Sequence, residues 1–216
     1  ILTVGADMSV EITLNHFHDW NMVGLPLVVE ETGYMDVFPD AVESTLYSFG
    51  EDGYEQEENL VLGNGYWARF DEAGSNVIFG EMIYSVDVQL MENWNMISGC
   101  SELGGTFIDP SGLIVPNTLY QFTDNGYENA YSIDPGLGYW VRSSGEGMVI
   151  VSSDIGSGKV NTYYHSILNN ANSISFNDRS LYFGIQIPEK DRISFSLPPQ
   201  PPAGSFDVRF SENTKI

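Results

Sequence analysis

The chain has 216 residues, of which 42% are hydrophobic and 13% aromatic, and this content supports packed cores and argues against disorder. Its formal net charge of −22 lies in residues 1–154, which carry 25 acidic and two basic residues, whereas residues 155–216 carry five acidic and six basic residues. Such acidity argues against nucleic acid or anionic lipid as a partner. No apolar run reaches the roughly 18–20 residues of a membrane span.

The change in charge predicts a domain boundary near residues 152–158, where a Ser- and Gly-rich stretch is typical of a linker. With the repeat described next, it predicts three parts: a β repeat over 1–85, a second over 86–154, and a C-terminal β domain or strand-exchanging extension over 155–216. Cys100 is the only cysteine, so it forms no internal disulfide and is interpreted as a small buried hydrophobe.

One stretch occurs twice. Gly-Asn-Gly-Tyr-Trp-Ala-Arg at Gly63–Arg69 returns as Gly-Leu-Gly-Tyr-Trp-Val-Arg at Gly136–Arg142, 73 residues later. Upstream, Trp-Asn-Met at 20–22 returns at 94–96, shifted by 74. Several matched sites in nearly one register indicate a duplicated unit.

Short strands are predicted along both units, beginning with the apolar–polar alternation of Val10–Leu14 and its counterpart Val86–Leu90. Aligning Leu14 with Leu90 predicts two extra residues in the next turn of the first unit, which places His16–Asp19 in a solvated turn. His16 and His18 as zinc ligands are the less favoured interpretation, because no further His lies nearby. Later predicted strands cover 22–29, 44–49, 54–61, 77–79, 96–99, 118–122, 127–133 and 148–151.

No segment keeps a helical apolar period, so the predicted fold is all-β: two tandem small β-barrel or sandwich repeats plus a C-terminal β segment. In the C-terminal part the pattern predicts strands at 163–168, 173–176, 181–187, 193–197 and 206–210. The proline-rich stretch Leu197–Pro202 is predicted to run extended outside any sheet.

In the repeated strand, side chains alternate between two faces. The candidate ligand-binding residues are Tyr66, Trp67, Arg69, Tyr139, Trp140 and Arg142. The two arginines are the only basic residues of the acidic part. The favoured interpretation is that Trp and Arg fix the sheet of each repeat, through ion pairing and a guanidinium–indole contact. The alternative is an aromatic platform for a sugar ring. Gly-x-Gly here precedes a strand, so it is not a phosphate-binding loop.

No catalytic motif occurs, so the chain is not predicted to be an enzyme. His165 stands alone and is interpreted as structural. No cofactor is predicted, apart from calcium as an alternative through oxygen ligands near the turns. The acidic residues considered for calcium are Glu51, Asp52, Asp124 and Asp134.

The paired units resemble a repeat of large secreted bacterial proteins exported by the type IX secretion system. The resemblance rests on Trp-Asn-Met-Val-Gly-Leu-Pro-Leu at 20–27 and Pro-Gly-Leu-Gly-Tyr-Trp-Val at 135–141. Residues 193–210 resemble the segment that precedes the sorting domain in such proteins. Two departures are Leu62, where the repeat has proline, and Ser-Gly-Cys at 98–100, where it has Gly-Leu-Pro. The resemblance implies an extracellular or cell-surface location and an adhesive, structural or accessory role.

The sequence therefore predicts a non-catalytic accessory or structural module of a secreted or cell-surface protein, mediating adhesion or packing. Its expected partners are other domains of the same polypeptide or a surface polymer. One alternative is a carbohydrate-binding module that uses Trp67 and Trp140. Another is a subunit of an extracellular filament, in which the positive C-terminal part docks on the acidic repeats of a neighbouring copy.

Overall fold

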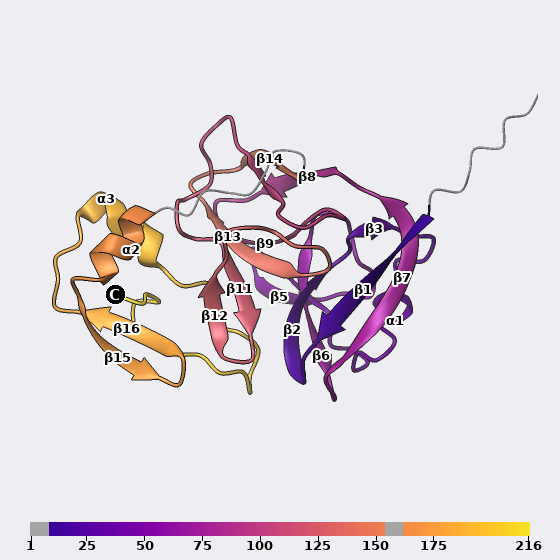
Figure 1. The fold of residues 1–216 in the computed structure, drawn as a ribbon, viewed down its shortest axis with the longest axis horizontal. Coiled ribbons are helices and arrows are strands. Elements are labelled where there is room, and N and C mark those ends of the chain that lie inside the picture. Colours follow the sequence, from indigo (N-terminus) through magenta and orange to yellow (C-terminus); the bar gives the residue numbers. More distant parts are fainter. Residues whose placement is uncertain (1–8, 154–161) are drawn as a thin grey trace, which may run out of the picture.

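The computed structural model describes residues 9–153 and 162–216, and it confirms the all-β prediction. Figure 1 shows a first repeat (indigo to magenta), a second repeat beside it, and a C-terminal region (orange to yellow) at the far end of the long axis. The C-terminal region is defined as residues 162–216. The last strand of the first repeat ends at Met82, and the first strand of the second repeat begins at Ser85.

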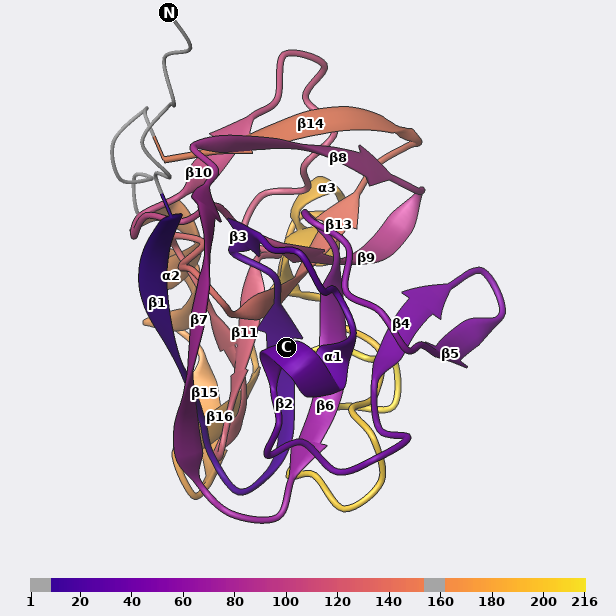
Figure 2. The same cartoon turned by 90° about the vertical axis from the view of Figure 1, so that its right-hand side faces the viewer.

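The first repeat consists of two antiparallel sheets, with strand orders β1-β7-β3 and β2-β6-β4-β5. Figure 2 shows β1 and β7 as one pair of long strands, with β2 and β6 running beside them. Its elements are β1 (Ser9–His16), β2 (Asp19–Gly24), β3 (Leu27–Val28), α1 (Tyr34–Val37), β4 (Tyr47–Gly50), β5 (Gly53–Gln56), β6 (Gly65–Phe70) and β7 (Gly74–Met82).

The second repeat has the same plan, with sheets β8-β14-β10 and β9-β13-β11-β12. Strands β8 to β14 of the second repeat therefore correspond in order to β1 to β7 of the first repeat, and each pairs with the corresponding neighbours. The elements are β8 (Ser85–Leu90), β9 (Asn93–Ser98), β10 (Thr106–Ile108), β11 (Tyr120–Thr123), β12 (Gly126–Asn129), β13 (Gly138–Ser143) and β14 (Gly147–Ser152). Within the described residues no sheet closes into a barrel, so the sandwich-like form of the prediction is the one that holds.

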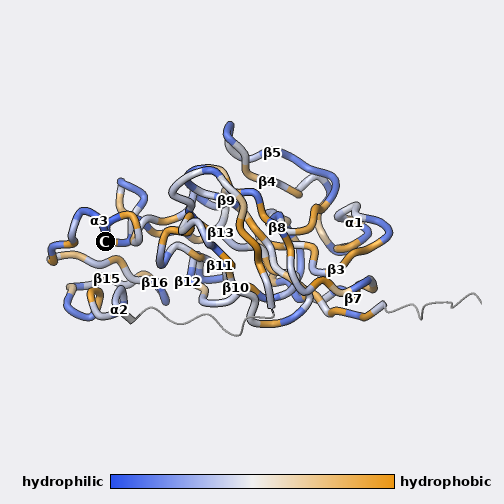
Figure 3. Tube along the Cα trace, turned by 90° about the horizontal axis from the view of Figure 1, so that it is seen from above, coloured by the Kyte–Doolittle hydropathy of each residue, from blue (hydrophilic) through white to orange (hydrophobic). Residues whose placement is uncertain are grey.

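A core lies between the two sheets of each repeat. In the first repeat, Leu14 and Ile78 of the three-stranded sheet pack with Tyr66 and Phe70 of the four-stranded sheet. The second repeat has its own cluster at the corresponding place. Figure 3 shows hydrophobic stretches along the strands in the middle of the molecule and hydrophilic tips such as the end of the β4–β5 hairpin.

The predicted insertion in the β1–β2 turn is wrong. β1 ends at His16 and β8 at Leu90, and each following strand begins three residues later, so the two turns have equal length. His16 is therefore the counterpart of Leu90. It is buried in the first repeat rather than solvated, and its ring stacks on Phe70 with centroids 3.9 Å apart.

The equal turns explain the repeated Trp-Asn-Met sequence. The Asn21 side chain accepts a hydrogen bond from the Phe17 amide and donates to the carbonyls of Phe17 and Asp19. Asn95 makes the same three bonds with Met91 and Asn93. Asp19 and Asn93 both have φ of 76°, a conformation that Asn and Asp tolerate better than most residues. One asparagine thus fixes each turn.

The C-terminal region departs from its prediction. It consists of α2 (Thr162–Leu168), the hairpin β15 (Asn172–Phe176) and β16 (Arg179–Phe183), α3 (Glu189–Arg192) and a 3₁₀ turn over Ile193–Phe195. The strands predicted at 163–168 and 193–197 are wrong, because the first is helical and the second begins with the 3₁₀ turn. Residues 206–210 form no strand apart from an isolated bridge between Phe210 and Thr214. The described part of this region adds no strand to the sheets of the repeats.

Candidate functional site

The repeated motif lies where the two repeats meet. The four-stranded sheets pack through a third hydrophobic cluster, called here the interface cluster, with the buried members Met22, Trp67, Met96, Tyr120, Tyr127, Trp140 and Leu197. Trp67 contacts Phe122 edge-to-face with ring centroids 4.8 Å apart, and Trp140 contacts Phe49 in the same way at 4.9 Å. Since these two pairs are counterparts, the repeats face each other with approximate two-fold symmetry.

The glycines of the motif bring the two backbones together. The Gly24 amide donates to the Gly136 carbonyl at 3.0 Å, and the Ser98 amide donates to the Gly63 carbonyl at 2.9 Å. These bonds are again counterparts. Gly63 and Gly136 have φ of 83° and 78°, which favours glycine. The second glycine of each motif, Gly65 or Gly138, has no room for a side chain, because the backbone of the other repeat lies against it.

The structure separates the six candidate ligand-binding residues by face. Tyr66 and Tyr139 point into the core of their own repeats, and Trp67 and Trp140 point into the interface cluster. The predicted alternation of the strand is thus observed. Both indoles are 0% exposed. A sugar platform needs an open ring face, so at these positions the structure offers no surface on which that interpretation can rest.

The two arginines cap the edge of the interface cluster. Arg69 forms an ion pair with Asp19 at 3.0 Å, and Arg142 donates to Asn93 at 3.0 Å. Arg142 also lies 5.8 Å from the Trp94 ring, so its cation–π partner is the tryptophan of the Trp-Asn-Met sequence rather than that of its own motif. Burial lowers the pKa of Arg142, and the charge of Glu92 opposes that shift.

The proline-rich stretch runs across the interface cluster and contacts both repeats. Tyr54 of the first repeat donates to the Gln200 carbonyl at 2.7 Å, and its counterpart Tyr127 donates to the Pro199 carbonyl at 2.9 Å. Leu197 inserts its side chain into the cluster. The C-terminal region therefore closes one side of the contact between the repeats.

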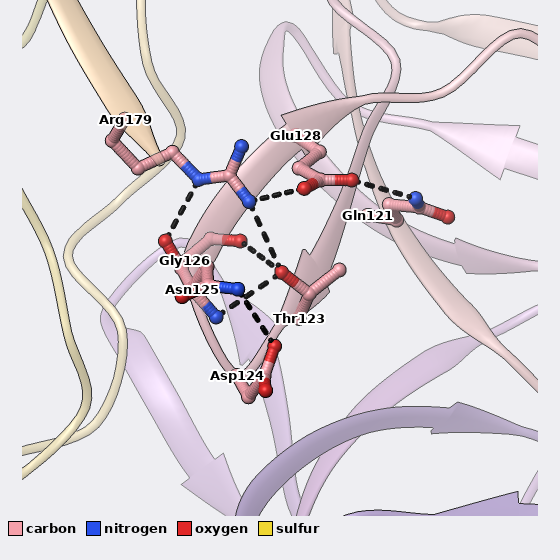
Figure 4. A network of polar contacts seen from close by, with 7 residues as sticks. All are labelled: Gln121, Thr123, Asp124, Asn125, Gly126, Glu128 and Arg179. Carbon is pink, nitrogen blue, oxygen red and sulfur yellow. Dashed lines mark hydrogen bonds and ion pairs between the residues drawn. The ribbon is translucent and has the colours of Figure 1, made fainter. Parts of the chain in front are cut away.

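Arg179 of β16 anchors the C-terminal hairpin on the second repeat. It forms an ion pair with Glu128 and donates to the Asn125 carbonyl at 2.7 Å and the Thr123 hydroxyl at 3.1 Å. Figure 4 shows the guanidinium beside the β11–β12 turn, with Gln121 holding the other carboxylate oxygen of Glu128. The first repeat has Gly50 in place of Thr123, so part of this anchor exists only on the second repeat.

A cavity of about 320 Å³ lies between the second repeat and the C-terminal region. In it, the Tyr131 hydroxyl meets His165 Nε2 at 2.5 Å, and Lys215 Nζ donates to Asn129 Oδ1. Lys215 also lies over the ring of Tyr120, with Nζ 5.2 Å from the centroid. Burial lowers the pKa of Lys215 to about 8. Sequence reasoning missed this group, because no local pattern connects residues so far apart.

The residues considered for metal binding do not gather into a site in the described part of the chain, where no three His, Cys, Asp or Glu side chains lie close enough to hold an ion. Asp134 instead accepts a hydrogen bond from the Gly104 amide at 3.0 Å. His16 lies 4.0 Å from Asp40, and burial lowers its pKa against the opposing charge of Asp40. Cys100 is buried and contacts the Val151 carbonyl.

Comparison with known proteins gives no match to a family model, a curated protein or a solved structure. None of the helices in the described ranges has the length and apolar character needed to cross a membrane.

Proposed function

We propose that this chain is a non-catalytic structural module of a secreted or cell-surface protein, in which two repeats and the C-terminal region act as one rigid unit. The observation that supports this most strongly is the use of the duplicated motif. Its glycines, tyrosines and tryptophans are occupied by packing within and between the repeats. A motif used in this way serves the stability of the scaffold.

The proposed task is mechanical: to hold neighbouring domains of the same polypeptide, or a surface polymer, at a fixed spacing. The secreted location rests on the resemblance to type IX cargo repeats. The strongly acidic repeats suit this role because their charge keeps the module well solvated and repels nucleic acid.

Calorimetric unfolding of the full chain tests the rigid unit. A module held together by the interface cluster unfolds in a single transition, with a calorimetric enthalpy equal to the van't Hoff enthalpy. Two separate transitions, or a calorimetric enthalpy well above the van't Hoff value, would show that the repeats unfold as independent domains, and the proposal would fail.

A direct binding assay distinguishes the structural role from the alternative of carbohydrate binding. The full chain is mixed with insoluble polysaccharides, and retention is compared with that of Trp67→Ala and Trp140→Ala. A structural module is not retained. Retention that is lost in a folded tryptophan variant would support the carbohydrate-binding role instead.

A filament is the second candidate, and the ion pair between Arg179 and Glu128 favours it. Within one chain, this pair joins the C-terminal region to the acidic second repeat. In a filament, the C-terminal region of one copy would make this contact with the second repeat of the next copy. Sedimentation from low to high salt tests it: assembly that dissolves as salt rises supports a filament, and a monomer at every salt concentration contradicts it.

A further inference from the structure

Lys215 is a half-buried lysine whose ammonium group has no opposite charge beside it. Among the described residues no carboxylate lies within ion-pair distance of it, although Arg69, Arg179 and Arg209 each have one. Its hydrogen-bond partner is the Asn129 amide oxygen, which is neutral. A lysine ammonium in such a place is costly, because burial removes its water without supplying a counter-charge.

Separate hydrogen bonds hold the Lys215 backbone and the Asn129 side-chain amide in place. The Lys215 amide donates to the Phe195 carbonyl at 3.2 Å, and the Lys215 carbonyl accepts from Tyr182 at 2.8 Å. On the other side, Asn129 Nδ2 donates to the Asn117 carbonyl at 2.9 Å, so the amide is fixed with its oxygen toward Nζ. Lys215 and Asn129 are thus each positioned by contacts that do not depend on the other residue.

The surroundings favour the neutral amine, which is the nucleophilic form. With a pKa of about 8, roughly a tenth of the Lys215 side chains are neutral at pH 7, and more at higher pH. Two carboxylates of the same cavity are already paired with arginines, Glu128 with Arg179 and Asp207 with Arg209. The titratable and charged residues that line the same cavity are Tyr120, Tyr127, Glu128, Tyr131, His165, Asp178, Arg179, Tyr182, Asp207 and Lys215.

We propose that Lys215 and Asn129 join in an intramolecular isopeptide bond. The neutral Nζ attacks Cγ of Asn129 and forms the Nζ–Cγ bond, and the Cγ–Nδ2 bond then breaks. One Nζ proton passes to the departing nitrogen, so ammonia leaves and a secondary amide remains. No oxidant or reductant takes part. The Tyr120 hydroxyl donates to the Ser196 carbonyl at 3.2 Å and also interacts with the Asn129 side chain, so it is the group that we assign to relay the proton.

The bond would fasten the C-terminal region to β12, across 86 residues of sequence. A cross-link of this kind stabilises a fold by restricting the unfolded chain, as a disulfide does. With a single cysteine, this chain has no internal disulfide to do so. The first repeat carries Gln56 at the position of Asn129, so the reaction is specific to the second repeat.

The test is the intact mass of the purified full chain, followed by a peptide map. The cross-linked chain is lighter than its sequence mass by one ammonia molecule. Digestion after Arg and Glu then releases a branched peptide that joins residues 129–142 to 213–216. Lys215→Arg and Asn129→Ala should give no branched peptide and show no ammonia loss within residues 129–142 or 213–216. Tyr120→Phe, which removes the relay, should lower the cross-linked fraction, whereas its counterpart Tyr47→Phe should not.

One side reaction has to be separated. Asn64 and Asn125 each precede a glycine, and either loses ammonia when it closes to a succinimide. That loss persists in Lys215→Arg and lies outside the branched peptide. The proposal is overturned if the unaltered chain keeps its full mass after incubation at pH 9, where Lys215 is mostly neutral, or if its ammonia loss maps to Asn64 or Asn125 and the branched peptide is absent. Because the mass and the peptide map of the unaltered chain decide, a variant that fails to fold does not obscure the answer.

Discussion

The backbone at Gly138 lies so close to Val23 that a Cβ atom added to the glycine would stand 2.7 Å from the Val23 carbonyl oxygen. At the counterpart position, a Cβ on Gly65 would stand 2.5 Å from the carbonyl oxygen of Ile97. Both contacts cross from one repeat to the other. The Gly-x-Gly sequence is therefore a device for close approach between two sheets, which explains why it was duplicated with them.

Gly138→Ala should destabilise the fold by about 1–3 kcal/mol, because the methyl group forces the repeats apart. Gly65→Ala should do the same. Urea unfolding measures the loss. Gly145→Ala is the control, since a Cβ there meets nothing closer than 4.0 Å. Equal stability of Gly138→Ala and Gly145→Ala would refute the close-contact account.

Asn95→Ala should cost about 1–3 kcal/mol, because it leaves the amide of Met91 and two turn carbonyls without their partner. Asn21→Ala should cost a similar amount in the first repeat. The control is Asn15→Ala, an exposed residue of β1. If chemical unfolding shows that Asn15→Ala loses as much stability as Asn95→Ala and Asn21→Ala, the turn asparagines do not stabilise the turns as described.

His16 should make the protein less stable as the pH falls. Its pKa in the folded state lies below the ordinary histidine value of 6.5, because burial disfavours the charged ring. The unfolded state then binds the proton more readily, so stability is full above pH 6.5 and falls as the pH drops through that value toward the lower folded pKa. His16→Leu, which copies Leu90, should remove this slope between pH 7.5 and 5.5.

Thermal unfolding across that pH range gives the comparison. His18→Leu is the matched control, because His18 is exposed. The account of His16 fails if the slope survives in His16→Leu, or if it disappears in the control.

Arg179→Ala should loosen the C-terminal region, because it removes an ion pair and two hydrogen bonds to the second repeat and leaves Glu128 without its charge partner. A loss of about 1–3 kcal/mol is expected for such a partly buried charged group. Limited proteolysis should then cut the variant faster in residues 162–216. Arg192→Ala, whose partner Glu189 is largely exposed, should behave like the unaltered chain.

The sequence predicted much of the fold, because duplication and alternation are local and periodic signals. It placed Tyr66 and Trp67 on opposite faces of a strand, and the structure agrees. Alternation does not say what covers each face. The second repeat buries Trp67 through residues that are distant in sequence, such as Phe122, 55 positions away. A buried interface and an open aromatic platform therefore give the same alternation of side chains in the sequence.

The errors also have physical causes. His16 occupies a core position that Leu90 fills in the second repeat. Because a histidine stands where a leucine is expected, the sequence comparison aligned Leu90 with Leu14 instead of with His16. The helix at Thr162–Leu168 is short, and its Tyr and Ile residues favour strands by propensity. Its buried Tyr164 packs on Phe195 at 5.7 Å, and such tertiary contacts override propensity.

Hydrogen exchange at the amides of Gly24 and Ser98 tests the central claim most directly, because each of these two amides donates a backbone hydrogen bond from one repeat to the other. If the repeats form one unit, both amides should exchange only through global unfolding, with the same free energy as core amides of β6 and β13. Exchange of Gly24 and Ser98 at a much lower free energy, while β6 and β13 stay protected, would show that the repeats separate in the native state and would contradict the account.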